Sequence, residues 1–168
     1  MRNSTLCYIE RNGQYLMLHR VKKEHDVNRD KWIGIGGGFW EDESPEDCIR
    51  REAMEETGLT LGRVRLRSVV TFVMAEQPCE HMFLFTCDDF SGELADCDEG
   101  ILEWIDKTAL YDLELWEGDR IFLQKLERDC QFFTLKLAYD KSGTLLSAIL
   151  NGQKELKTPG VPIDTNSL

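Results

Sequence analysis

The apolar positions near the start of the chain predict two β-strands, at Thr5–Ile9 and Tyr15–His19. The residues between them, Arg11-Asn12-Gly13-Gln14, contain an Asn-Gly pair that is typical of a tight hairpin turn. Later apolar stretches predict further strands and a last hairpin across Asp140-Lys141-Ser142-Gly143. These stretches are Val64–Met74, His81–Cys87, Ile101–Ile105, Phe132–Tyr139 and Thr144–Leu150.

Helical spacing is predicted in two places between the strands. Ser44-Pro45-Glu46-Asp47 is typical of a helix start, because Ser44 caps free N–H groups and proline fits the first helical position. Gly58 is typical of a helix end, which leaves a helix of about 13 residues. A second helix is expected at Glu117–Arg128. Strands and helices in this order predict an α/β fold with a mixed central sheet between helices.

The length of 168 residues suits one domain, expected at 1–151, followed by a flexible C-terminal tail at 152–168. A net charge of −11 argues against polymeric nucleic acid as a partner. No apolar stretch reaches the ~18 residues of a membrane span, so no membrane partner is expected. The six cysteines form no Cys-x-x-Cys pair, and a reducing cytoplasm is the expected location.

Three acidic residues of the first predicted helix, Glu52, Glu55 and Glu56, are spaced i, i+3 and i+4. They therefore project from one helix face, where the carboxylates repel one another unless a cation binds. Oxygen ligands of this kind suit Mg²⁺, with Mn²⁺ as a possible substitute. A run of charges is usually only a solvated helix face, but the preceding loop Gly34-Ile35-Gly36-Gly37-Gly38 favours a metal site, because glycine permits close backbone approach.

The acidic face is part of a longer spacing that runs from Gly37 to Leu59 and includes Glu43, Arg51 and Gly58. A chance match to this spacing has a probability of roughly one in a million in a chain of this size. The segment resembles the signature of the Nudix hydrolases. That resemblance implies an α/β/α sandwich and hydrolysis, with Mg²⁺ or Mn²⁺, of a nucleoside diphosphate linked to another group.

The resemblance also implies roles for individual residues. Glu52, Glu55 and Glu56 would bind the metal, and one of them could also act as the base toward water. The backbone carbonyl of Gly36 would be a further ligand. Glu43 and Arg51 would orient the acidic face, since arginine binds a carboxylate by a forked pair of hydrogen bonds.

Other segments resemble the MutT-type enzymes that hydrolyse oxidised nucleotides such as 8-oxo-dGTP. These segments are Trp32–Gly38, Thr71-Phe72-Val73 and Trp116-Glu117-Gly118-Asp119. In the animal enzymes a tryptophan followed closely by an aspartate reads the purine, and Trp116 and Asp119 match those positions. Alternatively, Trp116 is a core aromatic residue and Asp119 only favours the start of the following helix.

Two positions depart from the family pattern. Ile33 stands where the animal enzymes have an asparagine that contacts the base, and Asn28 is a candidate substitute. Gly38 stands where a lysine usually follows the paired glycines. Substrate identity is therefore less certain from the sequence than the class of reaction.

Further candidates lie in two loops. Glu99 matches the place from which a later loop adds a carboxylate to Nudix metal sites, although the turn could equally be a solvated one. Basic residues before the glycine loop could hold phosphates, or form a solvated basic loop. They are Arg20, Lys22, Lys23 and Lys31.

The leading hypothesis is Mg²⁺-dependent hydrolysis of oxidised purine nucleoside triphosphates to the monophosphate and pyrophosphate, a nucleotide-pool sanitation step linked to DNA repair. The first alternative is a Nudix hydrolase of a nucleotide sugar, ADP-ribose or an ordinary dNTP. The second is a non-catalytic nucleotide sensor, which a complete carboxylate set disfavours. The expected assembly is a monomer or a homodimer.

Overall fold

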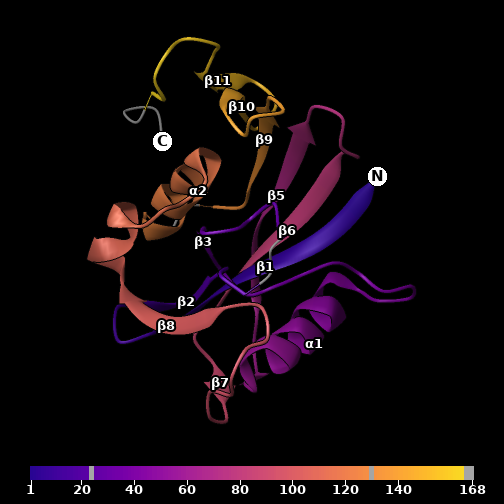
Figure 1. Ribbon diagram of the computed structural model, residues 1–168, viewed down its shortest axis with the longest axis vertical. Helices are drawn as coiled ribbons and strands as arrows, with labels where there is room; N and C mark the ends of the chain where they lie inside the picture. The colour runs from indigo at the N-terminus through magenta and orange to yellow at the C-terminus, as the bar shows by residue number, and fades with distance from the viewer. Residues whose placement is uncertain (23–24, 129–130, 165–168) are drawn as a thin grey trace. The chain divides into compact units, whose positions relative to one another are not determined.

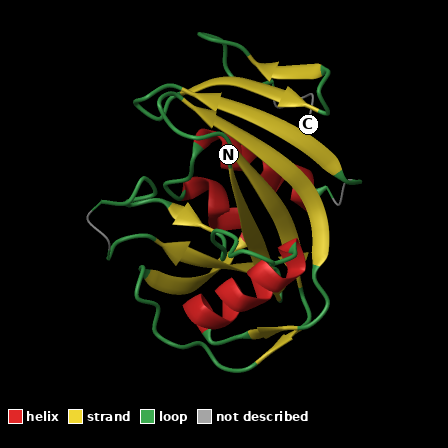
Figure 2. Cartoon of the chain, turned by 90° about the vertical axis from the view of Figure 1, so that its right-hand side faces the viewer, coloured by secondary structure: helices red, strands yellow, loops and turns green. Residues whose placement is uncertain are grey.

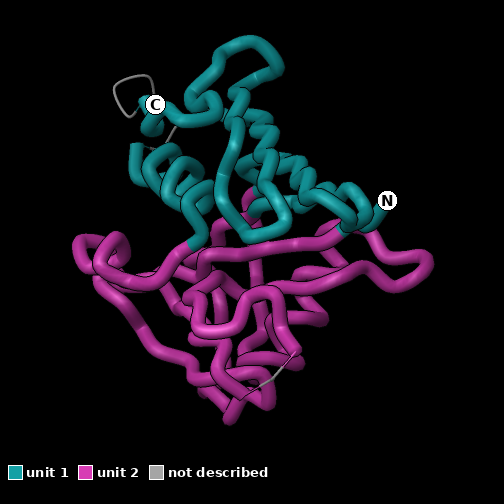
Figure 3. The backbone as a smooth tube through the Cα atoms, turned by 45° about the horizontal axis from the view of Figure 1, so that its top comes forward, with its two compact units in different colours: residues 1–3, 66–84, 116–168 teal, residues 4–65, 85–115 magenta. Residues whose placement is uncertain are grey.

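A computed structural model describes residues 1–22, 25–128 and 131–164 of the chain (Figure 1). Strands make up most of the regular structure, and α-helices are few (Figure 2). The chain divides into two compact units, coloured separately in Figure 3. Unit 1 contains residues 1–3, 66–84 and 116–168, and unit 2 contains residues 4–65 and 85–115.

Unit 2 is organised around β2 (Gln14–His19), which pairs antiparallel with three other strands. The hairpin from β1 (Arg2–Arg11) to β2 confirms the predicted turn, with Asn12 and Gly13 at φ values of 49° and 75°. Its other partners are β3 (Trp32–Ile33) and β8 (Ile101–Asp106), and the β8 register pairs His19 with Ile101. That register brings the segment before β8 next to the segment that follows β2.

Helix α1 (Pro45–Thr57) has the boundaries that its capping residues predict. Ser44 and Asp47 form a capping box, in which the Ser44 side chain accepts from the Asp47 N–H and the Asp47 carboxylate accepts from the Ser44 N–H. Gly58 ends the helix in the left-handed conformation, at φ 74°. Ile49 and Ala53 are fully buried, so α1 is fixed along one face and keeps its acidic residues on another.

The remaining regular segments of unit 2 are short. Strands β4 (Thr60–Leu61) and β7 (Phe90–Ser91) form a separate antiparallel pair. A 3₁₀ helix, η1, covers Lys107–Asp112. The sequence did not predict the two strands, because two-residue strands are too short to display a hydrophobic period.

Unit 1 contains a mixed sheet, as predicted. Strand β5 (Arg65–Met74) is parallel to β9 (Phe133–Tyr139), while β9 pairs antiparallel with β10 (Leu145–Leu150). Strand β6 (Glu80–Cys87) lies on the other side of β5 and continues into unit 2. Helix α2 (Glu117–Glu127) packs on β9 where Gly118 donates its N–H to the Tyr139 hydroxyl oxygen at 3.0 Å.

Part of the segment expected to be a loose tail is regular structure. Residues Lys154–Lys157 form β11, which pairs antiparallel with β10. The side chain of Leu156 is buried there, and its burial offsets the conformational entropy lost on ordering the strand. The domain limit at residue 151 stays a prediction. Within residues 1–22, 25–128 and 131–164, no helix is long and apolar enough to cross a membrane.

Candidate functional site

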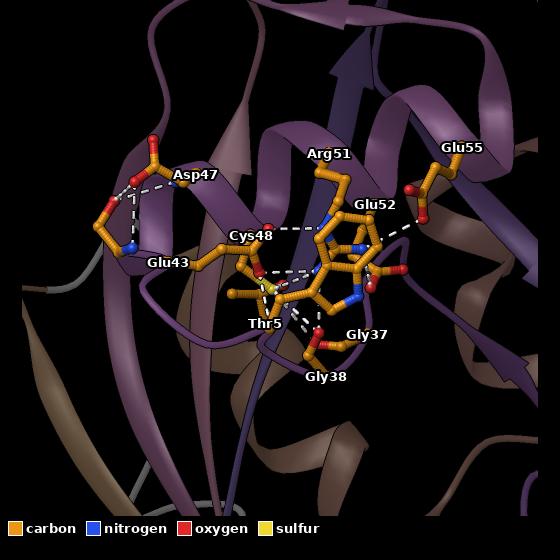
Figure 4. A network of polar contacts seen from close by, with 11 residues as sticks. Thr5, Gly37, Gly38, Glu43, Asp47, Cys48, Arg51, Glu52 and Glu55 are labelled. Atoms are coloured by element: carbon orange, nitrogen blue, oxygen red, sulfur yellow. Dashed lines mark hydrogen bonds and ion pairs between the residues drawn. The ribbon is translucent and has the colours of Figure 1, made fainter.

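Arg51 is the centre of the predicted acidic face on α1 (Figure 4). Its guanidinium binds Glu43 in a fork, with Nε donating to Oε1 at 2.6 Å and Nη2 donating to Oε2 at 2.9 Å. Both side chains are mostly covered, with exposed fractions of 14% for Arg51 and 13% for Glu43. The contact that the sequence suggested for Arg51 is therefore present, and it joins α1 to the loop before it.

The same guanidinium also holds two of the predicted metal ligands. Nη1 of Arg51 donates to Glu52 Oε1 at 2.6 Å and to Glu55 Oε2 at 3.1 Å. Nη2 donates to the carbonyl oxygen of Gly38 at 3.0 Å, which ties the glycine loop to the helix. Because both glutamates meet one nitrogen, their carboxylates lie side by side, as Figure 4 shows.

The Arg51–Glu43 pair is strongly charged. Hydrogen bonds from Arg51 lower the pKa of Glu43 to about 2 from its ordinary value of 4.5, and the Trp40 N–H, 2.9 Å from Oε2, adds to the effect. Hydrogen bonds to Glu43 and Glu52 raise the pKa of Arg51. The pair is therefore ionised near neutral pH.

A second arginine, Arg20, lies close to the other two predicted carboxylates. Nη1 of Arg20 contacts Glu99 and lies 4.0 Å from Glu56 Oε1. Nε of Arg20 donates to Asp26 Oδ2 at 2.6 Å, which anchors the guanidinium in a mostly covered position. Glu56, on α1, and Glu99, before β8, therefore approach the same nitrogen from segments far apart in the sequence.

The glycine loop lies close to these acids, as predicted. The N–H of Gly36 donates to Glu56 Oε2 at 3.0 Å. A Cβ on Gly37 would lie 2.5 Å from the Glu52 carboxylate, and a Cβ on Gly36 would lie 2.1 Å from the Thr5 carbonyl oxygen. Gly36 therefore requires glycine, because a Cβ there would meet backbone atoms, whereas a Cβ on Gly37 would displace the Glu52 carboxylate.

The potential metal ligands at this site are all oxygen atoms, from carboxylates and from the backbone of a tight loop. That set fits a hard divalent cation with room for water and phosphate oxygens. In the described part of the chain, no three His, Cys, Asp or Glu side chains form a preassembled metal cluster. Instead, Glu52, Glu55, Glu56 and Glu99 are each held by Arg51 or Arg20.

The two residues predicted to read a base belong to unit 1. Trp116 immediately precedes α2, and its ring meets Tyr139 edge-on, with centroids 5.5 Å apart. Asp119 is buried on the first turn of α2, with 5% exposed. Burial raises the pKa of Tyr139, and the nearby charge of Asp119 raises it further. The structure therefore groups two aromatic side chains with a buried carboxylate, and both interpretations of Trp116 and Asp119 stay predictions.

The predicted phosphate-binding residues already have protein partners. The Lys22 ammonium donates to the Cys97 carbonyl oxygen, and Lys31 lies 3.6 Å from a Glu114 carboxylate oxygen. The backbone N–H of Asn28 donates to Asp26, the residue that anchors Arg20. Lys23 lies outside the described residues. Arg20, Lys22 and Asn28 are thus connected to one loop region around Asp26 and Glu99.

Sequence reasoning did not identify Asp26 and Trp40 as parts of this site. Asp26 orients Arg20, and the Trp40 ring covers Arg51 with 4.0 Å between Cζ and the ring centroid. Neither residue is one of the fixed positions in the spacing of acids and glycines. Trp40 does lie within that segment, three positions before Glu43, and an aromatic residue there was the signal that could have identified it.

Comparisons with known proteins show the family and the fold. The family model of the NUDIX domain matches residues 1–126. An uncharacterized Nudix hydrolase of Bacillus subtilis, YvcI, is 27% identical over 156 residues, covering 89% of this chain and 94% of that protein. An oxidized purine nucleoside triphosphate hydrolase of Danio rerio is 28% identical over 116 residues, covering 68% of this chain and 72% of that protein. A MutT protein structure from Bacillus halodurans has a TM-score of 0.82 at 24% identity, covering 92% of this chain and all of that one, which confirms the fold class.

Proposed function

The chain belongs to the NUDIX domain family, and from that premise we propose that it hydrolyses oxidised purine nucleoside triphosphates, such as 8-oxo-dGTP, to the monophosphate and pyrophosphate. The observation that carries the proposal is the acidic face of α1. Its carboxylates are aligned by Arg51 and Arg20 and lie against a glycine loop. The similarity to the Danio rerio hydrolase supports the choice of substrate class.

Nudix hydrolases generally use divalent metal ions, and Mg²⁺ is the ion we propose here, with Mn²⁺ as a substitute. The residues that would hold it are Glu52, Glu55, Glu56, Glu99 and the carbonyl of Gly36. When bound, such an ion neutralises phosphate charge and lowers the pKa of water. One of these carboxylates would take the proton from the attacking water.

The other residues would position the groups around the reaction. Arg51, held by Glu43, fixes Glu52 and Glu55 through two hydrogen bonds. Arg20 is placed by Asp26 beside both Glu56 and Glu99. We propose that Arg20, together with Lys22 and Lys31, also contributes positive charge for the triphosphate, because these cations lie on the loop before the glycines.

For the base, we propose stacking on Trp116 and hydrogen bonding to Asp119. An indole offers a flat face for a purine, and a carboxylate accepts from the ring N–H and the exocyclic amine of guanine. Asn28 is the candidate for the contact that Ile33 does not provide.

A nucleotide panel with Mg²⁺ tests the substrate. We expect the highest kcat/KM for an oxidised purine triphosphate, with pyrophosphate as product, and a raised KM in Trp116→Ala. Equal or higher efficiency on nucleotide sugars, ADP-ribose or ordinary dNTPs would contradict the substrate assignment. Binding without turnover across the whole panel would indicate a sensor.

The second candidate function is hydrolysis of another nucleoside-diphosphate-linked substrate. Ile33 favours it, because an apolar side chain at that position offers no hydrogen bond to a base edge. Ile33→Asn separates the two candidates. The substitution should improve kcat/KM for oxidised purine triphosphates if that position faces the base. Otherwise, kcat/KM should stay the same for every nucleotide of the panel.

A further inference from the structure

Trp40 is an exposed aromatic residue beside the acidic face. It lies in the loop between the glycines and α1, and 62% of it is exposed. Its ring nevertheless has one fixed neighbour, since Cζ of Arg51 lies 4.0 Å from the ring centroid. Its backbone N–H donates to Glu43 Oε2 at 2.9 Å, which fixes the loop backbone at the residue that carries the ring. The exposed indole therefore has a defined contact with the residue at the centre of the acidic face.

The Arg51 guanidinium, which contacts the Trp40 ring, donates hydrogen bonds from all three of its nitrogens. Its nitrogens donate to Glu43, Glu52, Glu55 and the Gly38 carbonyl. Because the N–H groups of a guanidinium lie in its plane, bonds from them resist sliding of the group more than tilting out of that plane. An aromatic ring with Cζ of Arg51 over it supplies that restraint through cation–π attraction and shields one side of the guanidinium from water.

We propose that Trp40 is a positioning residue that acts through Arg51. By holding the guanidinium flat, the indole fixes where the carboxylates of Glu52 and Glu55 lie. The inference rests on the proposed function, because it matters only if those two carboxylates bind the metal. Trp40 itself touches neither the metal nor the substrate in this account.

The test measures Mn²⁺ binding to the full-length protein without nucleotide, by electron paramagnetic resonance. Trp40→Leu keeps apolar bulk but removes the ring, and Trp40→Phe keeps a ring face. We expect Trp40→Leu to weaken Mn²⁺ binding about two- to fivefold, the range that one partly exposed cation–π contact supports. Trp40→Phe should recover most of that loss, which a purely steric role would not predict.

The chain provides a matched control. Cζ of Arg11 lies over the Trp104 ring at the same 4.0 Å, but neither residue contacts the acidic face of α1 in any described interaction. Trp104→Leu should therefore leave Mn²⁺ binding unchanged. Equal weakening of Mn²⁺ binding by Trp104→Leu and Trp40→Leu would overturn the proposal. The loss would then follow from removing any tryptophan that contacts an arginine, and not from the contact with Arg51.

A further variant separates failure of this inference from failure of the proposed function. Glu52→Gln removes a proposed ligand directly and should weaken Mn²⁺ binding by more than Trp40→Leu does. If Glu52→Gln weakens binding and Trp40→Leu does not, the role of Trp40 is wrong and the metal site stands. If Glu52→Gln binds Mn²⁺ as the wild type does, the metal site itself is wrong.

Discussion

Gly37→Ala displaces one carboxylate of the acidic face without removing any ionisable group from the chain. The added Cβ would lie 2.5 Å from the carboxyl carbon and one oxygen of Glu52, and 2.6 Å from the other oxygen. Ordinary contact begins at 3.4 Å, so the carboxylate must move by at least about 0.9 Å. A misplacement of about 1 Å at a reacting centre costs up to about 100-fold in rate, so we expect kcat to fall by about 10- to 100-fold.

The neighbouring glycine provides the control. A Cβ on Gly38 meets no atom within 4 Å, so Gly38→Ala should keep near-normal kcat. Both variants should melt close to the wild type, because Glu52 is a side chain that can move aside in Gly37→Ala. The assay is pyrophosphate release at saturating Mg²⁺ on the best substrate of the panel. Rates for Gly37→Ala within twofold of Gly38→Ala would refute the idea that the position of Glu52 limits turnover.

Three other predictions concern stability and reactivity. Since the pKa of Glu43 is lowered to about 2 from 4.5, its ion pair should stabilise the fold above about pH 4.5 and lose that contribution as the pH falls toward 2. The difference in unfolding free energy between the wild type and Glu43→Gln should therefore shrink over that interval, and a constant difference would contradict the assignment. Gly118→Ala should destabilise the protein by about 1–3 kcal/mol in denaturant titrations, because its Cβ would lie 2.4 Å from the Tyr139 hydroxyl oxygen. The Cys48 thiol, buried and with its pKa raised to about 11, should react with iodoacetamide far more slowly than the partly exposed Cys79, as peptide mass mapping would show.

Local sequence determined α1 almost completely. Ser44, Asp47 and Gly58 satisfy or terminate backbone groups within a few residues of themselves, so the helix limits follow from short-range hydrogen bonding. The spacing of Glu52, Glu55 and Glu56 then fixes their common face, because helix geometry leaves no choice. The hairpin between β1 and β2 was predictable for the same reason, since its turn is set by Asn12 and Gly13.

The segment Lys154–Lys157 shows where local reasoning failed. Its sequence carries little hydrophobic period, and it becomes β11 because β10 offers an open edge to pair with. A strand of that kind is stabilised by its neighbour and by burial of Leu156, not by its own propensity.

The sequence by itself determined the helix that carries the acids, their spacing and the presence of a glycine loop, because each depends on contacts between near neighbours. Only the tertiary structure decided how those acids are held. Arg20 and Glu99 are 79 positions apart, and they meet because β2 pairs with β8 in the register that sets His19 against Ile101. The contact of Gly37 with Glu52 and the stacking of Trp40 on Arg51 likewise depend on how the loop packs against α1. No spacing rule along the chain contains that information.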